Sequence, residues 1–548
     1  LAYVASRSLL VTTRLHISSG SGTVARARRE KASLELSYNT LSKYRKITCN
    51  IMGCMKSKPI QNSTEIDVFS NEIPRRDSDA TDVAVKPHEL SDSYSFEELE
   101  KDIFKPGEDY VVYDIAGMIC GRLSSVNEYK NCFGQKYLSL SLITIKSNGK
   151  VFLQAPMVRS IGQFEGKKKL SELDIRPILP EETKSLRERG RIFTKCGLGA
   201  HYKMYSEKMI LRGSLCDSQI SAEGRVMVDT SSFLHFHPDY SPLGYARRYV
   251  GRNFPGEGDL GIDCMMESSS ERTSLEIPEG SLHLCWPTLC GFSLKAKRWG
   301  EISVSSLSDI CFSDDAFTQL VLDDELKYKL KSLVENANKD MFTDIIQGKG
   351  GGCVFLLHGP PGCGKTLTAE AVSEILHRPL YCIDVGELGI TPESVEERLK
   401  KILEVAERWK AVVLIDECDI FLSRRSKDDV LRNAIVGIFL RLLEYYNGVL
   451  FLTSNRADDM DEAFESRISV SLEYGMLDQQ GRKQVWSNLL DAASIQDLDI
   501  ERLSSLELNG RQIKTAIRLA SSLARTAGEP VRQEHFTQTF SFANTTHG

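Results

Sequence analysis

The residues best suited to chemistry in this chain are the glycines, the lysine and the threonine of one short segment. Residues 354–366 read VFLLHGPPGCGKT. Glycines in such a loop let the backbone curl so that its N–H groups point inward at phosphates. Lys365 would reach the β- and γ-phosphates, and the Thr366 hydroxyl would bind Mg²⁺. The segment predicts nucleoside triphosphate binding by Gly359, Pro360, Pro361, Gly362, Cys363, Gly364, Lys365, Thr366 and Leu367.

Three further polar residues follow the ends of two apolar segments. AVVLIDECD (411–419) ends in Asp416 and Glu417, and GVLFLTSNR (448–456) ends in Asn455. Asp416 would hold Mg²⁺, directly or through water, and Glu417 would orient and polarise the attacking water. The Asn455 amide would hydrogen-bond the same water or the γ-phosphate. These residue types predict hydrolysis as well as binding.

Two arginines are candidates for stabilising transition-state charge. Arg467 lies just before a short apolar segment, in DEAFESRISVSLEY (461–474), and Arg511 lies in NGRQIKTAIRLASSLA (509–524). Arg467 would reach the γ-phosphate of a neighbouring subunit, or form an ordinary surface ion pair. Arg511 would reach the γ-phosphate from a helical lid, or be a solvated arginine at a helix end.

The elements needed to position these residues are visible in the hydrophobic pattern. Residues 412–415 and 449–453 have the composition and length of buried parallel strands. The phosphate-binding loop has an apolar strand before it and a helix after it, which Pro379 would stop. Its helix N-terminus would add a positive dipole end at the phosphates. The stripe of Ile513, Ala516, Ile517, Ala520 and Leu523 predicts a helix over 509–524.

Composition excludes several classes of protein. Hydrophobic and charged residues make up 41% and 26% of the chain, as in soluble globular proteins, and the net charge is −6. That charge argues against broad nucleic-acid binding, although a local basic patch is compatible with it. The 14 cysteines include no CxxC pair, which favours reduced thiols over a disulfide framework. No apolar run reaches the roughly 18–20 residues that span a bilayer.

The first methionine, Met52, opens MGCMKSKP, which fits an N-myristoylation pattern at Gly53 if translation starts there. Cys54 would accept a palmitoyl chain, and Lys56 and Lys58 would face anionic lipid. The heptad resembles the dual-acylated N-termini of some Src-family kinases. Residues 1–51 would then be translated non-coding sequence. Alternatively, their nine Lys or Arg against two Glu indicate an organellar presequence. We therefore expect a cytoplasmic protein, membrane-associated if Gly53 is acylated, with a mitochondrial location as the alternative.

The middle third shows short strands and turns, typical of an α+β or mainly β domain. Apolar alternation flanks Ser147-Asn148-Gly149 within 137–156, which predicts a hairpin, and alternation recurs at 221–233. Helical signal is confined to about 180–193, where Pro180 suits a helix start. Two histidines, His235 and His237, have the chemistry of metal ligands but no third partner, so a structural role is favoured.

Taken together, these motifs resemble those of the AAA+ ATPases. GPPGCGKT, LIDE, TSNR, the Arg467 region and GRQI match in order and spacing over roughly 315–548. The resemblance is closest to AAA proteins common in fungi, which share GFSLK-KWGE (here 291–301) and D-AF--LVL (here 314–322) and extend it over about 100–548. It implies a parallel five-stranded sheet between helices with an α-helical lid, binding ATP and Mg²⁺. It also implies homo-oligomeric rings, often hexamers, with Arg467 acting in trans. By position only, Ile345 and Ile346 would lie near the adenine.

Two departures from that family pattern affect the predicted function. Residues 384–399 (DVGELGITPESVEERL) contain no aromatic residue where many AAA translocases carry a gripping loop, and no second arginine follows Arg467. The favoured hypothesis is an ATP-hydrolysing machine that remodels an unknown protein client. The alternative is a slow nucleotide-dependent switch or scaffold, which acylation could anchor to a membrane. Oxidation or modification of Cys363 would block ATP in either case.

These observations divide the chain into four parts. Residues 1–92 are an untranslated or targeting segment with a disordered polar tether, and 93–300 are an N-terminal recruitment domain with a mobile insertion at 241–280. Residues 301–475 are the large nucleotide-binding subdomain, and 476–548 are the helical lid. The N-terminal domain would bind the client, and no nucleic-acid partner is expected.

Overall fold

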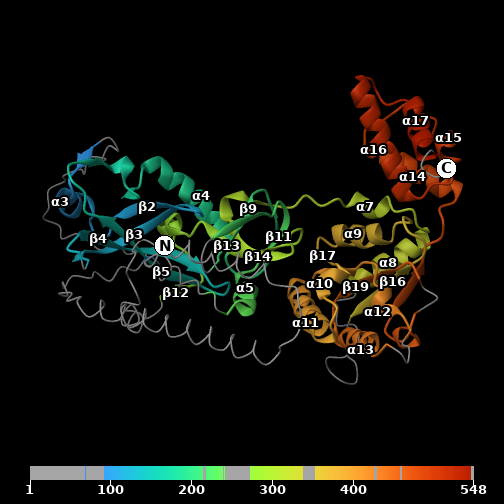
Figure 1. Cartoon of the computed structure of the whole chain (residues 1–548), viewed down its shortest axis with the longest axis horizontal. Coiled ribbons are helices and arrows are strands. Elements are labelled where there is room, and N and C mark those ends of the chain that lie inside the picture. Colours follow the sequence, from blue (N-terminus) through green and yellow to red (C-terminus); the bar gives the residue numbers. More distant parts are fainter. Residues whose placement is uncertain are drawn as a thin grey trace, which may run out of the picture.

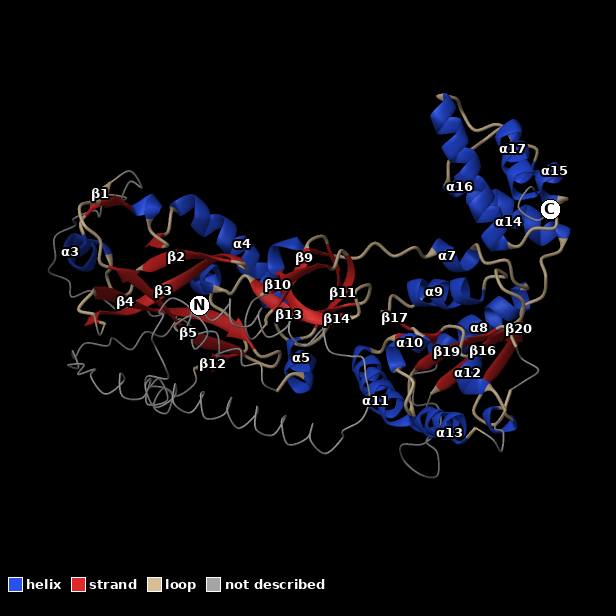
Figure 2. Ribbon diagram, viewed as in Figure 1, coloured by secondary structure: helices blue, strands red, loops and turns tan. Residues whose placement is uncertain are grey.

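The computed structural model describes Val68 and residues 92–131, 133–213, 217–238, 240, 272–336, 352–424, 429–456 and 460–544. Figures 1 and 2 show a β-rich N-terminal half, an α/β part and a small helical part at the C-terminal end. Among the described residues, no helix has the length and apolar character needed to cross a membrane.

The first part of the N-terminal half is an antiparallel six-stranded sheet in the order β12-β5-β4-β3-β2-β7. Its strands are β2 (Asp109–Asp114), β3 (Gly117–Lys130), β4 (Lys136–Ser147), β5 (Phe152–Gly162), β7 (Ile175–Pro177) and β12 (Thr273–Ser274). A small ladder of β1 (Ser93–Tyr94) and β6 (Lys168–Lys169), the helix α3 (Phe96–Glu98) and the π-helical turn η2 (Leu99–Ile103) accompany it.

The hairpin predicted at Asn148-Gly149 is confirmed. β4 and β5 pair in antiparallel register, with Ser147 opposite Phe152. The Asn148 side-chain oxygen accepts hydrogen bonds from the N–H groups of Lys150 and Val151, both at 2.9 Å. Gly149 has a φ of 84°, which L-residues with side chains adopt with strain. The turn chemistry visible in the sequence therefore fixes this part of the sheet.

The helix predicted at Pro180 is confirmed as α4 (Pro180–Cys196), with the proline in its first turn. Short 3-10 turns, η3 (Leu170–Glu172) and η5 (Glu279–Leu284), complete this part. α4 packs closely on η5 at Gly190. A Cβ at this position would lie 2.2 Å from the Leu282 carbonyl oxygen, so the close approach requires glycine. The strand β12 lies within the segment expected to be an insertion, 241–280, and η5 begins at its end; residues 241–271 are outside the described residues.

The second sheet has seven strands in the order β10-β9-β14-β13-β11-β8-β15. They are β8 (His201–Tyr205), β9 (Lys208–Leu211), β10 (Ser218–Ser221), β11 (Gly224–Val228), β13 (Thr288–Ser293), β14 (Arg298–Ser303) and β15 (Leu307–Ser308), with η6 (Val304–Ser306) between the last two. β14 thus crosses the expected domain boundary at 300/301.

One secondary-structure prediction in this sheet is wrong. The alternation at 221–233 predicts a strand to its end, but β11 stops at Val228 and a helix, α5 (Thr230–Phe236), follows. The Asp229 side chain caps this helix by accepting a hydrogen bond from the Ser232 N–H at 2.9 Å. A capping aspartate competes with continued strand pairing, which is why the alternation misleads here.

The α/β part contains the expected parallel five-stranded sheet, in the order β17-β18-β19-β16-β20. The strands are β16 (Cys353–His358), β17 (Leu380–Ile383), β18 (Val412–Ile415), β19 (Val449–Ser454) and β20 (Val470–Glu473). The helices are α7 (Asp315–Thr318), α8 (Asp324–Asn336), α9 (Lys365–Ile375), α10 (Val385–Leu388), α11 (Pro392–Trp409), α12 (Asp419–Leu422), α13 (Val430–Tyr445) and the 3-10 turn η8 (Glu462–Phe464).

Side-chain alternation along these strands builds a core on each face of the sheet. Phe355, Leu357 and Phe451 pack with α7, α8 and α9 on one face. Leu356 and Leu452 pack with α10, α11, α12 and α13 on the other. Strands buried on both faces read as continuous apolar runs, which is the pattern seen in the sequence.

The C-terminal part is the expected helical lid, with α14 (Gln479–Ala492), α15 (Ile500–Ser504), α16 (Gly510–Ala527) and α17 (Gln533–Asn544). Its separate core contains Trp486, Leu490, Ile513, Ile517 and Phe536. Figure 1 shows α16 rising away from the α/β part.

The second sheet packs directly on the α/β part. Met227 and Phe292 belong to the same buried cluster as α11 and β17. Phe292 stacks on Tyr381 with ring centroids 5.6 Å apart and lies 5.6 Å from Trp409. The indole N–H of Trp409 donates to the Asp229 carboxylate at 2.8 Å in a buried position. The second sheet and the α/β part therefore share one hydrophobic cluster, while most of the N-terminal half has a core of its own.

Candidate nucleotide-binding site

The predicted site residues meet at the carboxyl ends of three adjacent strands. β18, β19 and β16 are neighbours in the parallel sheet, and each is followed by one group of candidates: Asp416 and Glu417, Asn455, and the phosphate-binding loop 359–366. Parallel strands bring such residues to one edge, which is where open α/β sheets bind ligands. The structure thus brings these candidate residues together at one edge of the sheet.

The loop has the backbone conformation that its glycines permit. Gly359, Gly362 and Gly364 have φ values of 135°, 83° and 102°. A Cβ on Gly359 would lie 2.1 Å from the Tyr474 carbonyl oxygen, so this position also requires a close backbone approach. The loop leads into α9, whose first residue is Lys365. A phosphate here would meet backbone N–H groups and a helix N-terminus together.

Lys365 lies at the centre of the site. Its ammonium donates hydrogen bonds to the carbonyl oxygens of Gly359 and Pro360 at 2.7 and 2.8 Å, and to Asn455 Oδ1 at 2.9 Å. Burial lowers the pKa of Lys365, and the carboxylates of Asp416 and Asp419 act in the opposite direction. A lysine held this way is ready to exchange carbonyl partners for phosphate oxygens.

Thr366 and Asp416 offer the oxygen atoms that a magnesium ion prefers. The Thr366 hydroxyl lies 3.1 Å from Asp416 Oδ1, and the Thr453 hydroxyl donates to the same carboxylate oxygen. Mg²⁺ is usually held by one or two protein oxygens together with substrate phosphates and water. These hard oxygen donors beside the phosphate loop fit that ion. The described residues contain no cluster of three acidic, His or Cys ligands, which this mode of binding does not need.

Glu417 stands in a strained backbone conformation. Its φ is 52°, in the left-handed region that side-chain-bearing residues seldom adopt. The Glu417 N–H donates to the Thr453 hydroxyl at 2.9 Å, which holds the turn in place. Strain at a strand end of this kind is typical of functional sites, where the surrounding structure enforces it.

Asp419 and Thr453 are positioning residues that sequence reasoning missed. Asp419 accepts hydrogen bonds from the Ser454 hydroxyl at 2.5 Å and from the Asn455 N–H at 3.2 Å. Thr453 links Asp416 to Glu417, as described above. The available signal was a hydroxyl and a carboxylate next to the strand ends in LTSNR and IDECD.

The lid contacts the phosphate loop directly. The Gly510 N–H donates to the Gly362 carbonyl oxygen at 3.1 Å, and the Asn509 amide donates to the Pro361 carbonyl oxygen at 3.4 Å. Asn509 also caps α16. Arg511 is exposed in the first turn of α16, where its positive charge contributes to lowering the pKa of Lys365. Arg511 therefore lies at the rim of the site.

Arg467 is folded against its own subunit in this single chain. It precedes β20, which is an edge strand as expected. Its guanidinium forms an ion pair with Glu444 on α13 at 3.3 Å and donates to the carbonyl oxygens of Leu440 and Ala463. The surface ion pair that the sequence left open is thus present.

The remaining candidates lie elsewhere. Ile345, Ile346 and Gly53 are outside the described residues. His237 stacks on Phe233 with ring centroids 4.6 Å apart, and His235 lies 3.4 Å from Glu404. No group of three potential metal ligands is found around either histidine among the described residues.

Residues 384–399 form α10, a short turn and the start of α11. The turn exposes Ile390, whose side chain is 89% accessible. It is the most exposed of the large apolar residues in the described part of the chain. Residues 384–399 contain no aromatic residue, so the exposed apolar side chain of this turn, Ile390, is aliphatic.

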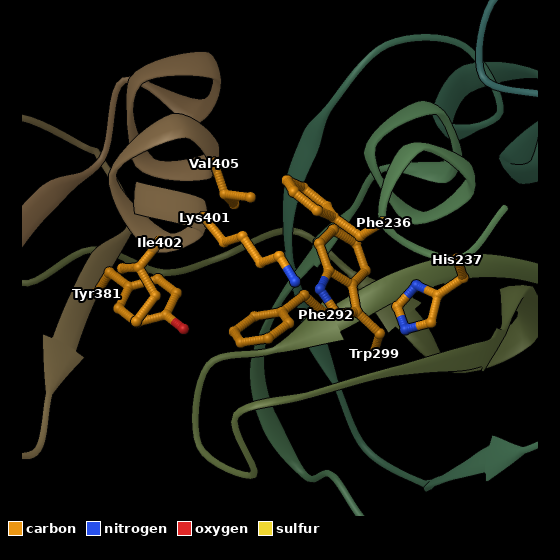
Figure 3. Close-up of a pocket in the computed structure, with 8 residues that line it drawn as sticks. All are labelled: Phe236, His237, Phe292, Trp299, Tyr381, Lys401, Ile402 and Val405. Atoms are coloured by element: carbon orange, nitrogen blue, oxygen red, sulfur yellow. The ribbon is translucent and has the colours of Figure 1, made fainter. Parts of the chain in front are cut away.

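A pocket of about 220 Å³ opens where the two halves of the molecule meet. Figure 3 shows Tyr381, Lys401, Ile402 and Val405 on the α/β side facing Phe236, His237, Phe292 and Trp299 on the other. None of these residues belongs to the phosphate-binding edge. The pocket is a feature of the junction and not of the nucleotide site.

Comparison with known proteins agrees with this geometry. Residues 355–476 match the family model described as "ATPase family associated with various cellular activities (AAA)". This part of the chain is an AAA domain. The matched range contains all the strand-end residues of the site and Arg467, whereas Arg511 lies beyond it.

The chain also has curated relatives that match about a third of its length. It is 30% identical over 196 residues to a protein of Methanothermobacter thermautotrophicus described as a homologue of a 26S proteasome regulatory subunit, covering 33% of this chain and 52% of that protein. Two Schizosaccharomyces pombe proteins are also similar. ATPase family gene 2 protein is 32% identical over 182 residues, which cover 31% of this chain and 22% of that protein. Vesicular-fusion protein sec18 is 29% identical over 197 residues, which cover 31% of this chain and 25% of that protein. The chain spans about half of the first relative and a quarter or less of the other two.

Proposed function

We propose that this chain binds ATP with Mg²⁺ and hydrolyses it to ADP and phosphate. The observation that carries the proposal is the convergence of Lys365, Thr366, Asp416, Glu417 and Asn455 at one edge of the sheet. An AAA domain spanning these residues supports it. The choice of ATP rests on the family resemblance.

Each residue has one role in this mechanism. The loop N–H groups and Lys365 bind the phosphates, while Thr366 and Asp416 hold the metal ion. Mg²⁺, when bound, neutralises charge on the β- and γ-phosphates. Glu417 accepts a proton from the attacking water, and Asn455 orients that water. Water adds to the γ-phosphorus as the bond to the ADP oxygen breaks, so that ADP and phosphate leave.

We further propose that the chain works as a homo-oligomeric ring that remodels a protein client recruited by the N-terminal half. Arg467 would leave Glu444 and reach the γ-phosphate in the neighbouring subunit, and Arg511 would sense it from the lid. Relatives named for the proteasome and for vesicle fusion favour work on protein assemblies.

The alternative is a slow nucleotide-dependent switch or scaffold. Two observations favour it: the aliphatic Ile390 in place of an aromatic grip, and the Arg467–Glu444 ion pair. Acylation at Gly53 would anchor either form to a membrane, and mass spectrometry of the N-terminus of the native protein would test it.

A binding and turnover measurement on the full chain tests the ATPase proposal. Fluorescent ATP should bind to wild type and to Glu417→Gln with similar affinity, while Glu417→Gln should lose at least about 100-fold in turnover. Lys365→Ala should lose binding itself. Equal turnover in wild type and Glu417→Gln would contradict the assigned mechanism. Tight binding with negligible wild-type turnover would favour the switch.

A further inference from the structure

The outward face of α16 carries a row of basic residues. Ile513, Ala516, Ile517, Ala520 and Ala524 face the lid core. Opposite them, the exposed residues Arg511, Lys514, Arg518 and Arg525 fall within a sector of about 60° at 3.6 residues per turn. The row is about 21 Å long at a rise of 1.5 Å per residue. We call these four residues the lid stripe.

The charge of the lid stripe is not neutralised by its own helix. α16 contains no Asp or Glu. Within the described part of the chain, none of the four side chains forms an ion pair. Exposed basic residues on α11 and α8 behave differently: Lys401 pairs with Glu397 at 2.7 Å and Lys329 with Glu325 at 2.6 Å. The lid stripe therefore presents four exposed cations on a helix that has no acidic residue of its own.

The stripe begins at the nucleotide site and runs outward. Arg511 affects Lys365 electrostatically, and Lys514 does the same to Glu370 on α9. Arg518 and Arg525 continue along the part of α16 that rises away from the α/β part in Figure 1.

We propose that the lid stripe docks an acidic polypeptide segment. Unpaired cations in a row complement carboxylates at a helical or extended spacing. A nucleic acid fits less well, because the whole chain has a net charge of −6 and α16 offers no aromatic residue for base stacking. Docking of an acidic segment on the lid stripe does not depend on ATP hydrolysis.

Fluorescence anisotropy with a labelled 20-residue poly-L-glutamate peptide tests the proposal on the full chain without nucleotide. Wild type should bind the peptide at low salt and lose it at high salt. Arg518→Glu/Arg525→Glu should weaken binding at least about fivefold. The matched control is Lys184→Glu/Arg187→Glu, the same charge change at exposed positions of α4, and it should bind like wild type.

Several outcomes would overturn the proposal. If wild type does not bind the peptide, or if both charge-reversal variants weaken binding equally, the lid stripe is only a solvated helix face. Tighter binding of single-stranded RNA than of the peptide would assign a nucleic acid. Self-association of wild type that only the stripe reversal abolishes would assign a second copy of the chain. If the reversal variant does not fold, Arg518→Gln/Arg525→Gln should weaken binding in the same direction.

Discussion

Arg225 of β11 and Glu374 of α9 form a two-pronged ion pair that ties the N-terminal half to the phosphate-binding helix. Both terminal guanidinium nitrogens of Arg225 donate to the Glu374 carboxylate, one of them at 2.9 Å. Glu374 also accepts the Ser313 N–H at 3.0 Å. Burial acts to raise the pKa of Glu374, but the hydrogen bonds from Arg225 and Ser313 outweigh it and lower that pKa.

Breaking this ion pair should destabilise the full chain. Arg225→Met leaves a partly buried carboxylate without its cation, so we expect a loss of about 1–2 kcal/mol in the free energy of unfolding. The exposed pair Lys401–Glu397 is the control, and Lys401→Met should cost less than about 1 kcal/mol. Urea unfolding measures both. A double-mutant cycle of Arg225→Met with Glu374→Gln that gives no coupling energy would contradict this account.

Truncating Phe292 should have a larger effect, because it removes the aromatic centre of the shared core. Phe292 is 5% exposed and contacts Tyr381, Trp299 and Trp409. We expect Phe292→Ala to cost about 3–5 kcal/mol and to make α11 more accessible to protease. Phe133→Ala is the matched control, since that side chain is 81% exposed. Equal stability of the two variants would show that the halves do not share a core.

Gly362→Ala tests the contact between the lid and the phosphate loop. The added Cβ would lie 2.8 Å from Asn509 at a φ of 83°. We expect weaker nucleotide binding together with increased hydrogen exchange at the start of α16. Gly166→Ala controls for backbone strain alone, because its φ is 78° and nothing lies within 4 Å. If both variants bind nucleotide like wild type, the lid contact has no role in binding.

Cys363 should react slowly with alkylating reagents at neutral pH. Burial raises the pKa of its thiol, and the nearby Lys365 only partly offsets this. A thiol with a raised pKa forms little of the reactive thiolate. We expect the exposed Cys311 to be labelled faster at pH 7, and labelling of Cys363, once forced at higher pH, to block nucleotide binding. Mass spectrometry reports each site, and faster labelling at Cys363 would count against the assigned environment.

Lys146 should make stability depend on pH. Burial lowers its pKa to about 7, and its ammonium lies 3.9 Å from the centroid of the Trp286 ring. Between about pH 7 and 10 the unfolded chain holds this proton and the folded chain does not, so the contribution to stability rises with pH. Between pH 7 and 8.5 the free energy of unfolding of Lys146→Met, measured by urea unfolding, should therefore fall relative to that of wild type. Parallel pH profiles would refute the assignment.

The sequence predicted the parts of the site that depend on local patterns. Lys365 and Thr366 lie in one loop, and Asp416 and Asn455 each follow an apolar strand, so the parallel sheet alone brings them together. The contacts of Arg225 with Glu374 and of Asp229 with Trp409 join residues 149 and 180 positions apart. No periodicity records such pairs, which arise only when two separate surfaces meet. The sequence offered a surface ion pair for Arg467, but it could not name Glu444 as the partner.

Steady-state ATPase rate against protein concentration tests the central claim most directly. Wild type should show a rate per subunit that rises with concentration, and both Arg467→Ala and Lys365→Ala should be nearly inactive alone. Mixing these two variants should restore part of the activity, since the intact phosphate site of an Arg467→Ala subunit could then take Arg467 from a Lys365→Ala neighbour. A rate independent of concentration, or a mixture no more active than its parts, would contradict a ring ATPase in which Arg467 acts between subunits.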